Sequence, residues 1–357
     1  MAIDLPGDDP DEAEPRIMEP HTPGGRVGFL DGLRGTMCVV VIIYHSVQQF
    51  PDKLDSTSMQ YTLNGKRAVE IFWCVSGYAL ALVNTRDRAV LAAIGRLPRL
   101  MLPVVFLGFV TSVVNFAMIF VSTQKDIADN FLLNKHRAFQ CFGCTGQDFN
   151  WMHIWTMRVE LYGSLALFFG HELLKNTEQP VRLVCAGAVL ALYVEPKLNF
   201  ILIGYVLCTW APPNQWFSKH YDTDVGTLVS GGSLIVFFGT LVANSIDHSR
   251  FGPGWQLVRY IGAASIFVCV LSTRKMERVF DNAVIGFIGR YSFELYISHY
   301  PIMQRCYDIP WVKHHPVTMV PTLLALTFAW SLLVQRHVNA ASLVLSKKNA
   351  RSLYFKE

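Results

Sequence analysis

The sequence predicts an all-α integral membrane protein, a bundle of about ten transmembrane helices with both termini in the cytoplasm. Three observations support this class. Of the 357 residues, 52% are hydrophobic and only 16% are charged, whereas a soluble chain carries about 25% charged residues. Apolar runs of roughly 15–22 residues recur along the chain, close to the length that a helix needs to cross a bilayer. Lysine and arginine are concentrated in alternate loops, as the positive-inside rule expects.

The candidate spans follow one another along almost the whole chain. They cover residues 33–50, 68–84, 100–121, 154–173, 181–195, 198–211, 226–244, 257–272, 284–304 and 317–338. The fifth and sixth runs are short and are separated only by residues 195–197, so they predict either a tight hairpin or one broken pair. No internal repeat is visible, which argues against transporter folds built from two related halves.

The orientation follows from the basic residues of the loops. With the N-terminus inside, the cytoplasmic segments hold Arg86, Arg88, Arg96, Arg99, Arg274, Lys275, Arg278, Lys347, Lys348 and Arg351, and the opposite loops hold Lys53, Lys66, Arg67, Lys125, Lys135 and Arg137. An even number of spans then places both termini in the cytoplasm.

The two ends of the chain differ from its apolar centre. Residues 1–28 are acidic, are rich in proline and glycine, and lack the basic start and short apolar core of a signal peptide. They predict a disordered cytoplasmic tail. Residues 341–357 predict a basic cytoplasmic tail, and residues 29–340 the transmembrane domain.

The net charge of +4 fits the positive-inside bias and gives no reason to expect a nucleic-acid partner.

Most of the eight cysteines lie in apolar runs, where cysteine acts as a small apolar side chain. Cys141 and Cys144 lie in a polar loop, but a zinc site would need two further ligands nearby. We therefore expect no metal site; a loop disulfide or two unrelated thiols remain open.

The first span contains two ionisable residues, Arg34 and His45, eleven residues apart. At 100° per residue they differ by about 20° after three full turns, so they share one helix face at a separation of about 16 Å. Arg34 is expected at the cytoplasmic mouth and His45 deep in the membrane, toward the far side. Taken singly, Arg34 could be a snorkelling anchor and His45 a hydrogen-bonded structural residue, but their shared face favours a joint function.

Other ionisable residues interrupt the apolar runs, where each costs roughly 2.5–3.5 kcal/mol to insert. Glu70 lies at the far-side end of the second run, and Glu160 lies one to two turns into the fourth run from the same side. His45, Glu70 and Glu160 are therefore expected at similar depth. Arg96 and Arg99 precede the third run at the cytoplasmic face.

Together these residues resemble the acyltransferase family 3 integral-membrane proteins, which O-acylate sugars, polysaccharides, lipids and fungal natural products. The family hallmark is an arginine, ten residues and a histidine in the first span, here Arg34 and His45. The other motifs are met in order by Glu70, Phe72, Trp73, Ser76 and Gly77; by Arg96 and Arg99; by Trp155, Thr156, Val159 and Glu160; and by Ser292, Leu295, Tyr296, His299 and Pro301. Phe293 replaces a usual tyrosine, so that hydroxyl is dispensable or shifted. The motif spacing and the length favour a fungal member.

The resemblance implies acyl-CoA as the donor and no tightly bound cofactor. Arg96, Arg99 and Arg34 would hold its phosphates, because guanidinium groups bind phosphate bidentately. The pantetheine arm would run along the first helix to His45. The implied partners are the lipid bilayer and a hydroxyl-bearing small molecule or glycan, with acetyl as the default acyl group and the endoplasmic reticulum as the location.

His45 is the expected general base, since a desolvated histidine stays neutral and can accept the hydroxyl proton. Glu160, or alternatively Glu70, would orient the ring and stabilise the imidazolium. Ser292, Tyr296 and His299 are candidates for donor binding and for the oxyanion donor, with interhelical hydrogen bonding as their alternative role.

Two other functions are compatible with buried acid and histidine residues. One is a transporter or proton-coupled carrier, and the other is a wax-synthase-like membrane acyltransferase with a single catalytic histidine. The cytoplasmic arginines, which suit the phosphates of CoA, argue against the carrier.

Overall fold

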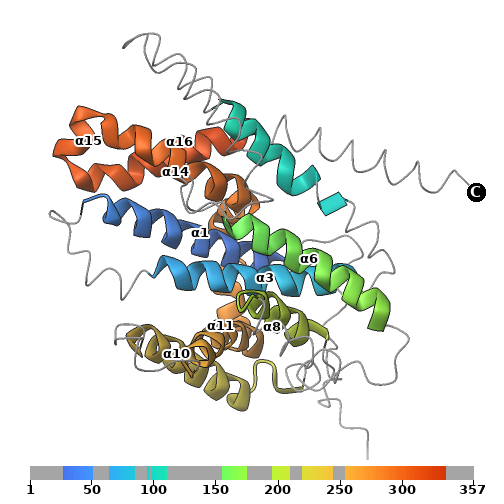
Figure 1. Ribbon diagram of the computed structural model, residues 1–357. Helices are drawn as coiled ribbons and strands as arrows, with labels where there is room; N and C mark the ends of the chain where they lie inside the picture. Colours follow the sequence, from blue (N-terminus) through green and yellow to red (C-terminus); the bar gives the residue numbers. More distant parts are fainter. Residues whose placement is uncertain are drawn as a thin grey trace, which may run out of the picture.

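The computed structural model describes residues 27–50, 64–84, 95, 96, 98–110, 155–174, 195–209, 219–243 and 254–334. Within these ranges the chain forms helices and no strand (Figure 1). The helices are α1 (Gly28–Gln48), α3 (Gly65–Asn84), Pro98–Val110, α6 (Trp155–Leu174), α8 (Leu198–Thr209), α10 (Asp224–Ala243), α11 (Gly254–Ser272), α12 (Arg274–Phe280), α13 (Ala283–Arg290), α14 (Ser292–Asp308), α15 (Pro310–His314), the 3-10 helix η2 (Pro316–Thr318) and α16 (Met319–Val334).

Most predicted spans coincide with helices of the structure. Among the described residues, α1, α10 and α11 are long and apolar enough to cross a membrane, and Pro98–Val110, α8 and α16 are shorter apolar helices. The predicted span 181–195 lies outside the described residues apart from its last residue, as do the second half of 100–121, residues 1–26, the tail 341–357, Cys141 and Cys144.

The predicted span 284–304 is not one continuous helix, because the helix breaks at Tyr291. The backbone there has φ −103° and ψ 3°, between the end of α13 and the start of α14. The side chain of Asn282 caps α13 by accepting hydrogen bonds from the backbone N–H groups of Val284 and Ile285. Arg290 and Ser292 flank the break, a polar signal that hydropathy averaged over the whole run does not show. The polar motif of the C-terminal region therefore lies on α14 alone.

The helices form three groups in space (Figure 1). Helices α14 and α16 pack together on one side, α1 and α3 lie in the middle, and α8 joins α3 to the side that holds the pair α10 and α11. Helix α1 contacts both α3 and α14, and α3 contacts both α6 and α11. The central position of α1 puts its polar residues between the groups.

Glycines allow the central helices to touch backbone to backbone. A Cβ atom on Gly77 of α3 would lie 1.8 Å from the carbonyl oxygen of Ile201 on α8, and one on Gly204 of α8 would lie 1.8 Å from the carbonyl oxygen of Cys74. The two helices thus approach through reciprocal glycines, as small residues permit in membrane proteins. On α1, Gly32 meets the backbone of Phe280 in the same way.

Large apolar side chains point outward from α10. Leu228, Ile235 and Val242 are 77%, 75% and 66% exposed, while the hydroxyl groups of Ser230 and Thr240 on the same helix are buried. A soluble monomer rarely exposes so continuous an apolar face. The arrangement, polar inside and apolar outside, is that of a helix facing lipid, so the described residues have the structure of a membrane protein.

The reciprocal glycine contact gives a direct test of the α3–α8 packing. We expect Gly204→Ala to destabilise the protein by about 2 kcal/mol or more, because the methyl group overlaps the backbone of α3. Gly232→Ala is the matched control, since a Cβ on Gly232 of α10 meets nothing within 4 Å, and a helical alanine is neutral or stabilising there. Thermal unfolding in detergent should show a lowered midpoint for the first variant only; equal midpoints would contradict the close approach.

Candidate active site

His45 lies in the last turn of α1, half-buried among aromatic rings. Its ring stacks on that of His299 at a centroid distance of 5.5 Å and an interplanar angle of 23°, and the rings of Tyr44 and Tyr300 approach edge-on at 5.4 and 6.0 Å. The Nδ1 atom of His45 is 3.2 Å from Oε1 of Gln48. An amide oxygen only accepts, so a neutral ring that donates from Nδ1 carries its lone pair on Nε2. That is the form a general base needs.

His299 is fully buried on α14, a helix that packs against α1. Its Nδ1 atom is 2.5 Å from the backbone oxygen of Tyr296, which requires that Nδ1 carry the proton. The hydroxyl of Tyr296 accepts a hydrogen bond of 3.1 Å from Thr156 on α6. Ser292, Tyr296 and His299 are all buried, and their spacing of four and three residues puts them on one face of α14.

Helices α1 and α14 run parallel in a fixed register. The thiol of Cys38 lies 3.4 Å from the backbone oxygen of Ser292, and the His45 and His299 rings stack seven residues further along both helices. Seven residues are about two helical turns. The structure thus joins the predicted first-span histidine to the predicted C-terminal motif.

Arg34 lies on the same uninterrupted helix as His45, eleven residues earlier. Its guanidinium is 3.9 Å from the carboxylate of Asp31, and both side chains are partly exposed. The predicted single helix that carries the Arg34–His45 motif is confirmed.

Glu160 contacts Arg96, which corrects two expectations. The Arg96 guanidinium forms an ion pair with Oε1 of Glu160, and its Nε donates to Ser164 at 3.2 Å. Arg96 and Glu160 were expected toward opposite faces of the membrane, and this contact shows that they are neighbours. Within the described residues, Glu160 forms no hydrogen bond or ion pair with His45, so the expected acid–histidine pair is not formed here. The side chain of Arg99 is exposed.

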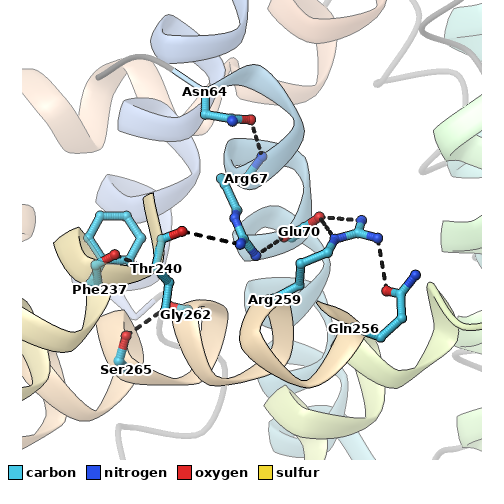
Figure 2. Close-up of polar contacts among 9 residues, drawn as sticks. All are labelled: Asn64, Arg67, Glu70, Phe237, Thr240, Gln256, Arg259, Gly262 and Ser265. Atoms are coloured by element: carbon cyan, nitrogen blue, oxygen red, sulfur yellow. Dashed lines mark hydrogen bonds and ion pairs between the residues drawn. The ribbon is translucent and has the colours of Figure 1, made fainter. Parts of the chain in front are cut away.

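Glu70 is also held by arginines rather than by His45 (Figure 2). Arg67, three residues earlier on α3, donates to Oε2 of Glu70 at 3.0 Å, and Nε of Arg259 on α11 donates to Oε1 at 2.7 Å. Nη2 of Arg259 makes a further contact with Oε1. In the part of the chain that the structure describes, Glu70 therefore has two cations and no contact with the imidazole.

Sequence reasoning missed Gln48, Arg67 and Arg259 as partners. Gln48 and Arg67 each lie three residues from the group they bind, a spacing at which helical side chains meet. Arg259 lies near the start of the run 257–272, and the cost of a buried charge could have singled it out.

The ion pair between Arg96 and Glu160 should be measurable as a coupling. We expect Arg96→Gln or Glu160→Gln to cost about 3–5 kcal/mol, because each leaves a buried charge without its partner. The double variant should lose much less than the sum of the two single losses. Arg158→Gln is the control, because Arg158 is 39% exposed and 3.9 Å from Glu195, and such pairs contribute about 0–1 kcal/mol. Additive losses in thermal unfolding would contradict the pairing.

Comparison with known proteins supports the interpretation of the motifs. The family model described as "Acyltransferase domain" matches residues 27–336. Proteins of Staphylococcus aureus strains COL and MSSA476, named "Putative O-acetyltransferase SACOL0978" and "Putative O-acetyltransferase SAS0844", are 21% identical over 324 residues. Each alignment covers 77% of this chain and 50% of the relative, so the chain spans about half the length of the curated relatives it matches.

No solved structure matches this chain. The family match nevertheless runs from the start of α1 to the end of α16 and contains the Arg34–His45 motif, both arginine-bound carboxylates and the polar face of α14. The chain therefore belongs to the acyltransferase family 3 of membrane proteins, the family that its motifs resemble.

Proposed function

We propose that this protein is a membrane O-acyltransferase that moves an acyl group, by default acetyl, from acyl-CoA to a hydroxyl group of a small-molecule natural product or a saccharide. Family membership and the printed names of its relatives support the reaction class, and favour it over a carrier or a wax-synthase-like enzyme. The observation that carries the proposal is the half-buried His45, whose Nδ1 is engaged by Gln48 so that Nε2 is the basic nitrogen.

In this mechanism Nε2 of His45 accepts the proton of the acceptor hydroxyl as its oxygen attacks the thioester carbonyl. The carbon–sulfur bond then breaks, the thiolate of CoA leaves, and the imidazolium returns its proton to that sulfur. No covalent enzyme intermediate is required. The buried surroundings favour the neutral ring before reaction.

Gln48 and His299 take the place that a carboxylate was expected to fill. The Gln48 oxygen fixes the tautomer of His45 and stabilises the developing imidazolium by its dipole, a smaller effect than that of a full charge. The ring of His299, held by the backbone of Tyr296, fixes the plane of the His45 ring. Gln48 and His299 are positioning residues in this proposal.

The donor is expected to bind on the side of Arg34 and Arg99. The side chain of Arg99 is exposed and suits the phosphates of CoA, and Arg34 lies about 16 Å from His45 along α1, a distance that suits the extended pantetheine arm. The positive charge of Arg96 is compensated by its ion pair with Glu160. Arg96 therefore contributes less to phosphate binding than the sequence motif that contains Arg96 and Arg99 predicts. Ser292 and Tyr296 would line the inner path of the acyl group.

The finer topology is also a proposal: about ten spans in residues 29–340, both termini in the cytoplasm, and a location in the endoplasmic reticulum. The apolar helices α1, α10 and α11 support several passes. Donor phosphates would then be bound from the cytoplasm, where acyl-CoA is made.

His45→Ala should abolish transfer while it preserves donor binding. We expect at least a 100-fold loss of turnover, the usual contribution of a general base, with acyl-CoA affinity changed less than about threefold. The assay follows radiolabel from acetyl-CoA into acceptor extracted from the producing cells, and calorimetry reports donor affinity. His314→Ala is the control, because that histidine is exposed on α15. A His45→Ala enzyme with a tenth or more of the normal turnover would exclude the base.

Gln48 offers a second test of the mechanism, because its side chain is exposed and its substitution leaves the packed core unchanged. Gln48→Leu should lower kcat about tenfold with little change in KM, since the ring loses its orientation. Gln48→Glu should stabilise the imidazolium by placing a negative charge beside it. The acidic limb of the kcat–pH profile should then move to higher pH, since the base must be deprotonated to act. An unmoved limb together with unchanged kcat in both variants would remove Gln48 from the mechanism.

A further inference from the structure

A cluster of two arginines and one carboxylate lies among α3, α10 and α11 (Figure 2), and in the described structure none of the three contacts the His45 ring. Arg67 and Arg259 both bind Glu70, so the three groups carry one net positive charge. Within the described residues, no second carboxylate forms an ion pair with either arginine. An uncompensated charge inside an apolar bundle is costly, so the cluster needs either a ligand or another source of negative charge.

Arg67 is the more deeply buried of the two arginines, with a side chain 4% exposed. Its Nη1 donates to Glu70, and its Nη2 reaches the backbone oxygen of Thr240 at a long 3.5 Å. Its Nε has no hydrogen-bond partner in the described structure although it is buried. The ring of Trp255 lies 5.8 Å from the guanidinium carbon. A buried donor on a cation that lacks an acceptor indicates capacity for an anionic group.

Arg259 gives access to the cluster. Its side chain is 23% exposed, and it lies five residues after the start of α11, about 7.5 Å along the helix axis. Gln256, one turn earlier, accepts from Nη1 of Arg259 at 2.8 Å and holds the guanidinium in place. Since Arg259 is the more exposed of the two arginines, an anion reaches it more readily than Arg67.

We propose that Arg67, Glu70 and Arg259 form a binding site for an oxyanion, a phosphate or carboxylate group that supplies the missing negative charge. Two guanidinium groups suit such oxygens because their N–H donors lie in rigid forks. Glu70 keeps the two cations together before the anion binds. The anion comes either from an acidic lipid headgroup or from a soluble anion. The site is independent of the proposed acyl transfer.

The test uses the purified full-length protein in neutral detergent, with the thermal unfolding midpoint as the readout. Dioctanoyl phosphatidylglycerol, zwitterionic dioctanoyl phosphatidylcholine and inorganic phosphate are each titrated at one fixed ionic strength. Wild-type protein should show a saturable rise of the midpoint with at least one of the two anions, because binding to the folded state stabilises it, and a smaller rise with the zwitterionic lipid. Arg259→Gln should raise the half-saturating concentration about tenfold or more.

Arg158→Gln removes one positive charge elsewhere on the membrane helices and should respond like wild type. Should Arg259→Gln fail to fold, Arg259→Lys replaces it, since it keeps the charge but loses the fork and should still weaken the response. A response to phosphatidylglycerol alone assigns the site to acidic lipid, and a response to phosphate assigns it to a soluble anion. No anion-specific rise in the wild type, or an equal rise in the Arg259 variant, would overturn the site and leave a purely structural ion cluster.

Discussion

A charged side chain between apolar helices must find its partner inside the protein, because neither lipid nor packed hydrocarbon can solvate it. The structure meets this constraint with arginines. Arg96 binds Glu160, and Arg67 with Arg259 binds Glu70. Since Glu70 and Glu160 are engaged in this way, the hydrogen-bond partner of His45 among the described residues is the amide of Gln48, and its ring packs among those of Tyr44, His299 and Tyr300. The ion pairs of the bundle thereby leave no carboxylate among Glu70 and Glu160 to stabilise a charged His45 ring.

Features that depend on residues of a single helix were predicted correctly from the sequence. The Arg34–His45 motif lies on one helix, Glu70 and Glu160 are buried on α3 and α6, and the polar face of α14 turns inward. These follow from apolar run length and from the 3.6-residue period. The partners on other helices, Arg259 for Glu70 and Arg96 for Glu160, could not be predicted, because spacing fixes the face of a helix but not the neighbour that this face meets. The break at Tyr291 was missed since hydropathy averaged over the whole run hides the polar residues Arg290 and Ser292 that flank it.

Close backbone contact and buried charge support each other in this bundle. Gly77 and Gly204 bring α3 and α8 together, and Phe200 of α8 then lies with its ring 5.7 Å from the guanidinium of Arg259. A bulkier residue at either glycine would push α8 outward and separate this ring from the cation. The small residues at the helix contacts therefore also maintain the surroundings of the Glu70 cluster.

The shared register of α1 and α14 has a consequence for how the gene can change. Cys38 and His45 are matched to Ser292 and His299 at the same interval, so the two helices must keep equal lengths between these points. Removing one codon between Cys38 and His45 would turn the imidazole by about 100° and draw it back by about 1.5 Å, away from the ring it stacks on. Substitutions inside this interval can be absorbed by repacking, but insertions and deletions cannot unless both helices change together.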